Sequence, residues 1–233
     1  MFGSKEEAPR LSVCILTQNC ADKLVHALKS VETIADEIVV VDGGSTDNTK
    51  EVATSFEKVC YYYNPWPNNM GRQWNYAMDQ ATGDWILMLA SDEVVGENMR
   101  KKIGKLIRSR RHNCFIFPVY WLISTDPLLY VESKKLYPCY NQRLFRRLPQ
   151  YRFLVDDGSR SIHSTFPEEV QGVGKKIKDT HIFHFDLIYN DRQAREEKVR
   201  NYVAMDPRSK YTSEASYLYE DYPHKIKKCR EKL

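Results

Sequence analysis

The sequence predicts an α/β protein in which a mostly parallel central sheet carries helices on both faces, within a single domain. Three observations support this fold class. Strand and helix patterns alternate through the first half of the 233 residues. The first strand pattern is a continuous apolar run, which is typical of a parallel strand covered on both faces. Hydrophobic residues make up 42% and charged residues 28% of the chain, which excludes a disordered or fibrous protein.

The first strand is predicted at LSVCIL, residues 11–16. Leu24, Leu28 and Val31 then recur at the spacing of a helix that buries one face. EIVVV, residues 37–41, is the second strand, and it ends in an acid followed by two glycines. The alternation continues with a helix near 48–56, a third strand at Val59–Tyr63, a helix at Arg72–Ala81 and a fourth strand at Trp85–Leu89. Right-handed crossovers would make these strands parallel.

The second half has a less regular pattern. It predicts strands at Phe115–Ile123, Asn141–Arg147 and His181–Phe185, a charged helix at Arg192–Met205, and loops through most of 149–179. We expect this half to extend the same sheet. The predicted organisation is an extension at 1–10, a first half at 11–112, a second half at 113–210 and a basic tail at 211–233.

Positive charge is concentrated in two runs. The final segment KIKKCREKL holds five Lys or Arg against one Glu, a surplus that equals the net charge of +4 of the whole chain. RKKIGKLIRSRR, residues 100–111, holds seven positive residues and no acid. Such runs can contact anionic lipid or nucleic acid, or they can be solvated helix faces, and both interpretations are open. With no long apolar run and no apolar leader, we expect a cytoplasmic protein, with peripheral membrane contact through the tail as an option.

Two acids stand where the second and fourth strands end, at the edge where ligands bind in parallel sheets. Asp42 precedes Gly43-Gly44, which would let a ligand approach the backbone closely, and its carboxylate suits the ribose hydroxyls and base N–H of a nucleotide. A plain turn with a helix cap explains the same residues. Asp92, in Leu89-Ala90-Ser91-Asp92-Glu93, could hold Mg²⁺ or Mn²⁺ against a diphosphate, although such an acidic pair often only starts a helix.

Phosphate-loop and nucleophile motifs are missing. The sequence has no GxGxxG after the first strand, no GxxxxGK[ST] and no GxSxG, which argues against a dinucleotide dehydrogenase, a P-loop enzyme and an α/β-hydrolase. The stretches LSVCILTQN, ADEIVVVDGGSTDNT and NMGRQWNYAMDQATGDWILMLASDEVV together resemble the inverting glycosyltransferases of family 2, in particular the lipopolysaccharide-core glucosyltransferase type. The resemblance covers residues 11–95 densely and, more loosely, NQRLFRR and residues 181–202, and it implies a GT-A fold.

The resemblance implies a donor site for a nucleotide sugar, most often a UDP-sugar, in the first half of the chain. It implies that Thr17 and Asn19 line the nucleotide pocket and that Asp42 accepts a hydrogen bond from the base. The residues that we expect to bind the donor are Thr17, Asn19, Asp42, Gly43, Arg72, Asn75, Ser91 and Asp92.

The metal motif departs from the family pattern. Asp92 corresponds to the last acid of the family's DxD motif, but Ala90 replaces the first. The resemblance implies Mn²⁺ or Mg²⁺ held by Asp92, with a late histidine on the metal or diphosphate, for which His184 is the candidate. His181 and His184 form an HxxH pair in a predicted strand, where a satisfied core histidine is the other interpretation.

Inverting transfer needs a carboxylate near the acceptor hydroxyl to take its proton. The family often places this base well beyond DxD, and Asp157 is the candidate, with Asp156 beside it. A surface turn explains the same pair. His163 matches a family histidine that is usually followed by Glu, whereas Ser164 follows it here.

The sequence therefore predicts a glycosyltransferase that moves a sugar from a nucleotide diphosphate to a hydroxyl of a glycan or lipid-linked acceptor with inversion. Two rivals remain. Because of Ala90, the chain could bind nucleotide sugars without turnover. Because of the basic tail, the enzyme could act on modified bases of DNA, in which case deleting 225–233 would abolish salt-sensitive duplex binding. The sugar, the linkage and the oligomeric state are not determined by the sequence.

Overall fold

The computed structural model describes residues 7–133, 138–155 and 166–233. Its centre is a mixed sheet with the strand order β11-β7-β6-β8-β4-β1-β2-β3. The parallel part consists of β1 (Leu11–Thr17), β2 (Glu37–Asp42), β3 (Val59–Tyr63) and β4 (Trp85–Ala90). These strands lie within one residue of the four strands predicted in the first half. The predicted α/β class with a mostly parallel central sheet is confirmed.

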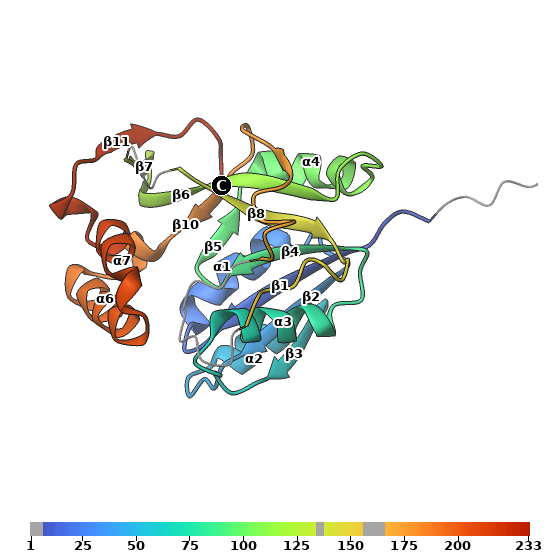
Figure 1. The fold of residues 1–233 in the computed structure, drawn as a ribbon, viewed down its shortest axis with the longest axis horizontal. Helices are drawn as coiled ribbons and strands as arrows, with labels where there is room; N and C mark the ends of the chain where they lie inside the picture. Colours follow the sequence, from blue (N-terminus) through green and yellow to red (C-terminus); the bar gives the residue numbers. More distant parts are fainter. Residues whose placement is uncertain (1–6, 134–137, 156–165) are drawn as a thin grey trace, which may run out of the picture.

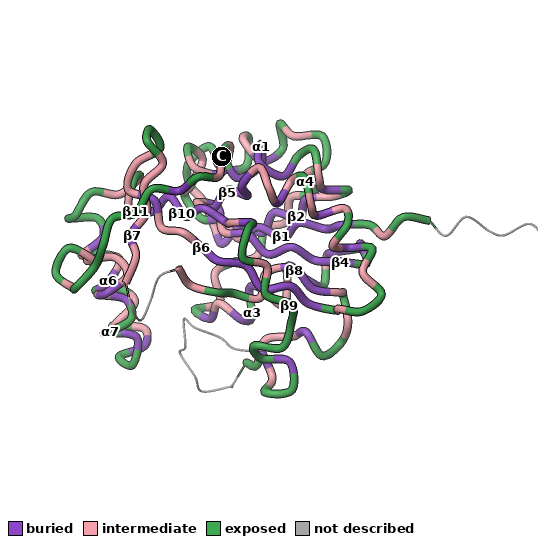
Figure 2. Tube along the Cα trace, turned by 90° about the horizontal axis from the view of Figure 1, so that it is seen from above, coloured by how far each residue is buried: buried purple, intermediate pink, exposed green. Residues whose placement is uncertain are grey.

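Helices cover both faces of the parallel part, because its strand residues alternate between two hydrophobic clusters. Val13, Ile15 and Val40 pack with α1 (Ala21–Val31), α2 (Thr49–Thr54) and α4 (Glu97–Ile107). Cys14 and Val39 point the other way and pack with Trp74 and Ala77 of α3 (Met70–Gln80). Figure 2 shows buried residues running along β1, β2 and β4, so the core lies directly against these strands.

The second half extends the sheet with antiparallel strands. These are β6 (Cys114–Thr125), β7 (Leu128–Glu132) and β8 (Cys139–Arg146), with β8 inserted between β4 and β6. Two short strands complete this layer: β10 (Ile182–His184) pairs with β6 and with β5 (Glu93–Val95), and β9 (Lys175–Lys176) pairs with β6. The strands predicted from 115, 141 and 181 are thus confirmed.

The remaining helices gather beside the antiparallel strands, away from α2 and α3 (Figure 1). They are α5 (Asp186–Tyr189), α6 (Arg192–Met205) and α7 (Lys210–Tyr217), with short 3₁₀ turns η1 (Pro207–Ser209) and η2 (Tyr219–Asp221). The observed α6 has the bounds that the sequence predicts. Among the described residues, no helix combines the length and apolar character needed to cross a bilayer.

The last residues, predicted as a basic tail, form part of the fold. β11 (Lys225–Lys228) pairs antiparallel with β7, and its four residues are exposed. Beyond it, the backbone N–H of Glu97 donates to the carbonyl of Lys232 at 3.0 Å. The two basic runs of the sequence therefore meet at the N-terminal end of α4.

Candidate functional site

The predicted site residues come together because β1, β2 and β4 are adjacent and parallel. Thr17 pairs in register with Asp42, and Leu16 pairs with Ala90, so the carboxyl ends of the three strands lie side by side. Thr17 is 6% and Asp42 1% exposed. The loops that follow these strands therefore share one edge of the sheet, where ligands bind in folds of this kind.

Asp42 organises the loop after β2. Its Oδ1 accepts hydrogen bonds of 2.8 Å from the backbone N–H groups of Gly44 and Ser45 and from the Ser45 hydroxyl. Its Oδ2 accepts one of 2.7 Å from the hydroxyl of Tyr61, on β3. Burial and this bond to a carboxylate raise the pKa of Tyr61. Most lone pairs of Asp42 are therefore used within the protein, as the turn interpretation expects, and contact with a nucleotide base stays a prediction.

The loops after β1 and β2 are tied together by Asn19, which has φ +50°. Its N–H donates to the Ser45 hydroxyl at 2.8 Å, and its Oδ1 accepts from the N–H of Thr46 at 2.8 Å. Beneath this bridge the Oγ1 atom of Thr17 is buried without a hydrogen-bond partner among the described residues. Such an unsatisfied hydroxyl at a strand tip is unusual and suits a site that a ligand completes.

Asp92 and His184 meet at the end of β4. Asp92 lies in the turn that joins β4 to β5, and β10 brings His184 opposite Glu93. The Nε2 atom of His184 is 3.3 Å from Oδ1 of Asp92, and the two side chains are 9% and 14% exposed. The ring of Trp121 covers the imidazole, with 4.0 Å between ring centroids. Two residues 92 positions apart, singled out from the sequence, are therefore in contact.

The pair is electrostatically coupled. Burial alone would raise the pKa of Asp92, but the charge and hydrogen bond of His184 and the charge of Lys198 hold it well below its usual range. Burial alone would lower the pKa of His184, but the negative charges of Asp92, Glu93 and Asp186 raise it. The site thus favours an ionised carboxylate beside a protonated imidazole in the absence of a ligand.

Sequence reasoning missed a lysine beside this pair. Lys198, on α6, contacts the carboxylate of Asp186, whose side chain has no exposed surface. Its ammonium group also lies 4.7 Å from the centre of the Tyr217 ring, which in turn packs edge-on against Trp121. Burial opposes the charge of Lys198, but Tyr202, Asp92 and Asp186 raise its pKa, so it is cationic. Only the docking of α6 reveals this, since that helix is charged along its whole length.

A divalent cation fits this arrangement only in part. Asp92 offers a carboxylate oxygen, and Nδ1 of His184 is buried without a hydrogen-bond partner among the described residues. Within residues 7–133, 138–155 and 166–233, no group of three or more His, Cys, Asp or Glu side chains could hold a metal ion. Ala90 has no carboxylate, and its N–H donates to Oε2 of Glu93 at 2.8 Å. Two protein ligands suit Mg²⁺ or Mn²⁺ when diphosphate oxygens supply the others.

Glu93 and Arg143 form a buried ion pair behind this turn. The Nη2 atom of Arg143 lies 2.6 Å from Oε1 of Glu93, with 16% and 3% of the side chains exposed. This pair fixes the turn that carries Asp92 against β8. Arg146, the other arginine of this strand, donates to the carbonyl of Ser109 at 2.6 Å and lies over the Trp85 ring. Both arginines therefore have partners within the protein.

The other predicted donor residues lie on two elements. The N–H of Gly43 donates to the carbonyl of Thr17 at 2.9 Å, and Ser91 is buried in the turn before Asp92. Arg72 is exposed in the first turn of α3, where its N–H donates to the Asn69 side chain at 2.9 Å.

Asn75 is engaged elsewhere: its amide exchanges two hydrogen bonds of 2.9 Å with the backbone of Phe153. Those bonds hold the segment that precedes the predicted catalytic base in the sequence. The predicted base Asp157, its neighbour Asp156, and His163 lie outside the described residues.

The HxxH pair is divided between two sides of the sheet. His184 faces Asp92, whereas His181 contacts Glu231 and packs against Tyr120 with 4.4 Å between ring centroids. Residues three apart on an extended chain point to opposite faces, so the two imidazoles do not form one site.

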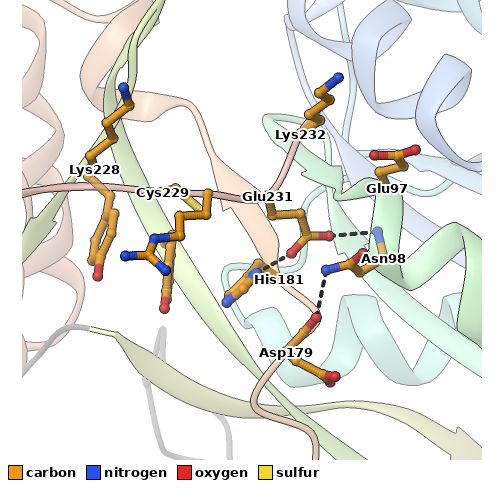
Figure 3. Close-up of a pocket in the computed structure, with 11 residues that line it drawn as sticks. Glu97, Asn98, Asp179, His181, Lys228, Cys229, Glu231 and Lys232 are labelled. Carbon is orange, nitrogen blue, oxygen red and sulfur yellow. Dashed lines mark hydrogen bonds and ion pairs between the residues drawn. The ribbon is translucent and has the colours of Figure 1, made fainter.

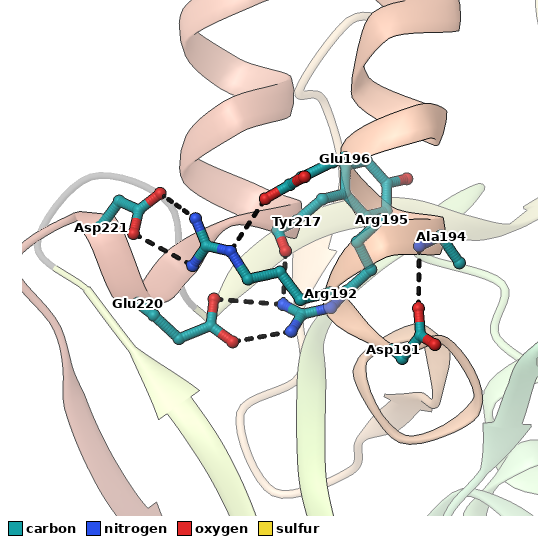
Figure 4. A network of polar contacts seen from close by, with 8 residues as sticks. All are labelled: Asp191, Arg192, Ala194, Arg195, Glu196, Tyr217, Glu220 and Asp221. Carbon is teal, nitrogen blue, oxygen red and sulfur yellow. Dashed lines mark hydrogen bonds and ion pairs between the residues drawn. The ribbon is translucent and has the colours of Figure 1, made fainter.

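Lys198 lies on α6, and two arginines at the start of this helix hold it in place (Figure 4). Arg195 is buried, donates to the carbonyl of Tyr217 at 2.6 Å and pairs with Glu220 through two bonds of 2.7 and 3.1 Å. Arg192 pairs with Asp221 at 2.6 Å in a more exposed position. This network ties α6 to η2 and to the end of α7, and it thereby positions Tyr217 and Lys198 beside Trp121.

Comparisons with known proteins agree with this fold. The model of the family described as Glycosyl transferase family 2 matches residues 12–163. An uncharacterized glycosyltransferase of Rickettsia bellii is 30% identical over 140 residues, which cover 58% of this chain and 47% of the relative. One of Mycoplasma pneumoniae is 34% identical over 119 residues, covering 46% and 40%. The chain spans about half the length of the curated relatives it matches.

Among solved structures, S. aureus TarS superimposes with a TM-score of 0.55 at 15% identity, covering 90% of this chain and 43% of TarS. Residues 1–349 of TarS in complex with UDP-GlcNAc give a TM-score of 0.51 at 15% identity, covering 90% and 71%. At this level of identity the likeness concerns the fold, and it confirms the predicted GT-A fold.

Proposed function

We propose that this chain, which belongs to glycosyl transferase family 2, moves a sugar from a UDP-sugar to a hydroxyl of a glycan or lipid-linked acceptor with inversion. The observation that carries the proposal is the contact between Asp92 and His184 beside the loops at the carboxyl ends of β1 and β2. Members of this family are transferases, and a relative in fold, TarS, was crystallised with UDP-GlcNAc.

The nucleotide would lie over the loops after β1 and β2. The unpartnered hydroxyl of Thr17 and the loop at Gly43 are the groups we expect it to contact. Asp42 would act mainly through the loop that it holds, with the remaining capacity of Oδ2 available to a base N–H. Ser91 and Arg72 would flank the sugar and diphosphate.

The diphosphate would lie against Asp92, His184 and Lys198. Protonated His184 and the Lys198 ammonium place positive charge where negative charge develops on the departing phosphate, which is the largest single contribution in many enzymes. When bound, Mn²⁺ or Mg²⁺ held by Asp92 and by the neutral imidazole of His184 would supply this positive charge in place of the imidazolium. Because Ala90 removes one acid of the family motif, we propose that this chain depends more on its own cations.

On the acceptor side, we propose Asp157, with Asp156 beside it, as the base that takes the proton of the attacking hydroxyl. The two hydrogen bonds between Asn75 and Phe153 support this, since they anchor the chain three residues before Asp156 beside α3. We propose a nucleotide sugar as the donor and a glycan or lipid-linked sugar as the acceptor.

The test is a thermal-shift panel of nucleotide sugars with and without Mn²⁺. UDP-sugars should raise the melting temperature most, because a ligand at about 100 times its Kd adds about 2.7 kcal/mol to the free energy of unfolding. Asp92→Asn should remove the increment that Mn²⁺ adds. Asp126→Asn, an exposed acid in the turn between β6 and β7, is the matched control and should retain it. A normal metal increment and normal turnover in Asp92→Asn would overturn the site.

The alternative that Ala90 favours is a protein that binds nucleotide sugars without turnover. It predicts the same melting shifts as the enzyme. Release of UDP from a UDP-sugar, measured with a panel of glycan acceptors and Mn²⁺, separates the two: turnover supports transfer, and tight binding with no UDP release supports the binding protein.

A further inference from the structure

A pocket lies on the opposite side of β6 and β10 from the Asp92–His184 pair. Its volume is about 380 Å³. Neighbouring residues of β6 serve the two sides: Trp121 covers His184, whereas Tyr120 lines the pocket with His181. The N-terminal end of α4 and the last residues of the chain form the rest of its wall. None of the residues proposed for the donor lines this pocket.

Three acids and three cations line the pocket, but the acids have partners within the protein and most of the cations do not. Three acids line it, but Glu97 pairs with Lys101, Asp179 pairs with Lys102, and Glu231 contacts His181. Three cations also line it: Lys228, Arg230 and Lys232. Besides Lys101, the charge of Lys232 helps to lower the pKa of Glu97, whereas no salt bridge joins Lys228 or Arg230 to another described residue. A ligand with more than one negative charge would match this surplus.

The pocket already holds one anion of the protein itself. Figure 3 shows Glu231 between His181 and Asn98, with Lys228 and Lys232 extending on either side. The carboxylate accepts a hydrogen bond of 2.7 Å from the backbone N–H of Asn98 and contacts the imidazole. This carboxylate uses the N–H of Asn98 and contacts His181, so an added anion would have to bind the cations of the last segment, Lys228, Arg230 and Lys232.

Aromatic rings form another wall. Tyr120 and Tyr130 stack with 4.1 Å between ring centroids, and both are half-buried. Aromatic faces pack against sugar rings or lipid chains, and phenol hydroxyls can donate to phosphate oxygens. Cations together with an aromatic wall suit an organic phosphate better than a simple carboxylate.

We propose that this pocket, lined by Tyr120, Tyr130, His181, Lys228, Arg230 and Lys232, binds a phosphate group carried by a sugar or by a lipid headgroup. A phosphate monoester carries about 1.5 to 2 negative charges at neutral pH, which matches the unmatched cations. Arg230 offers a planar set of donors, and the two lysines add mobile charges at the rim. This second site is separate from the proposed donor site and could hold a charged acceptor or a membrane lipid while the reaction proceeds.

The test uses glucose 6-phosphate as the probe in isothermal titration calorimetry, with glucose as the uncharged comparison. The protein should bind the phosphate ester and not glucose. Arg230→Gln, and separately the double variant Lys228→Gln/Lys232→Gln, should weaken binding at least about tenfold, since hydrogen bonds to charged groups are worth that much. The matched control is Lys175→Gln/Lys176→Gln, two exposed lysines outside the pocket, which should bind normally.

A parallel experiment identifies the source of the phosphate. Sedimentation with phosphatidylcholine vesicles that contain phosphatidate, and with vesicles that lack it, measures recognition of a lipid headgroup. Loss of binding in the pocket variants alone supports the proposal in either arm. The proposal is overturned if neither probe binds, or if the control variant loses binding equally.

Saturating UDP separates this proposal from the function proposed above. The probe should bind equally well in the presence of UDP and in Asp92→Asn. Displacement of glucose 6-phosphate by UDP would place it in the donor site and overturn the second site, whereas failure of UDP to bind at all would affect only the proposed function. Circular dichroism and melting curves establish that each variant is folded.

Discussion

The side-chain amide of Asn75 holds the backbone of Phe153 from both directions, with its Nδ2 donating to the carbonyl and its Oδ1 accepting from the N–H, each at 2.9 Å. Asn75→Ala should lower the free energy of unfolding by about 1–2 kcal/mol, as expected for lost hydrogen bonds. Because the proposed base follows this segment, transfer should fall further than UDP affinity. Urea denaturation, calorimetry and turnover measure the three quantities.

Asn75→Asp is the control, since it keeps the acceptor and loses only the donor. It should lie between the wild type and Asn75→Ala. An equal loss of UDP affinity and turnover in both variants would contradict the idea that Asn75 acts through the anchored segment.

Lys198→Met should be strongly destabilising, because it leaves the carboxylate of Asp186 buried without its cation. Breaking a buried pair costs about 3–5 kcal/mol, and the lower end is expected since the Lys198 side chain is 28% exposed. Adding Asp186→Asn should recover part of the loss. Urea denaturation of the two single variants and the double variant gives the coupling, and additive losses would mean that the contact contributes little.

The two arginines of α6 should differ. Arg195→Met removes the cation of a pair in which Arg195 is 8% exposed and should lower the free energy of unfolding by about 3 kcal/mol. Arg192→Met removes a partner of Asp221 from a pair in which the side chains are 46% and 50% exposed, and we expect less than about 1 kcal/mol. Thermal and urea unfolding of both variants measure this, and similar losses would show that burial does not govern the network.

Gly43→Ala should fold like the wild type. An added Cβ would lie 3.5 Å from Cβ of Trp66 and 3.6 Å from the side chain of Gln18, which is ordinary contact. If a nucleotide approaches the backbone here, UDP affinity should fall while the melting temperature stays constant. Gly83→Ala is the contrasting case, since its Cβ would lie 2.8 Å from the N atom of Ser12 and should destabilise the protein. Unchanged UDP affinity in Gly43→Ala would remove Gly43 from the donor site.

Stability should depend on pH through Glu37. Burial alone would raise its pKa, but hydrogen bonds from Ser12, Thr82 and Gly83 lower it below its ordinary value of 4.5. A lowered pKa means that the stabilisation is complete above pH 4.5 and is lost as the pH falls through the folded-state pKa. Glu37→Gln should therefore be less stable than the wild type at pH 7, and the difference should shrink below pH 4.5. A constant difference between pH 3 and 7 in urea denaturation would disprove this linkage.

The parallel half of the fold could be predicted almost residue by residue, because each strand is a buried apolar run and each crossover helix has a regular apolar face. Val59–Tyr63 was predicted with the bounds that β3 has. The antiparallel additions were harder. KIKK reads as a charged tail, and only its pairing with β7, nearly a hundred residues earlier, makes it a strand.

The candidate site shows the same division. Asp92 could be named from the sequence because it stands where a strand ends, and His184 because the family resemblance implies a late histidine. The structure brings the two into contact. Lys198 could not be named, since nothing in a uniformly charged helix indicates which charge faces inward. Its partner, the fully buried Asp186, lies on α5, so the ion pair depends on how α5 and α6 pack against each other.

The last residues of the chain contact the N-terminal end of α4, and this limits how the charge of the basic tail can be tested. Glu97 and Asn98 donate their N–H groups to Lys232 and Glu231, and Cys229 is buried beside them. Cutting the chain after 224 would therefore uncap a helix and expose the apolar residues that Cys229 packs with, such as Leu122 and Phe183. Weakened adsorption to DNA or lipid in a truncated protein would then report misfolding as readily as lost attraction. Neutralising single lysines, with full-length protein throughout, separates the two causes.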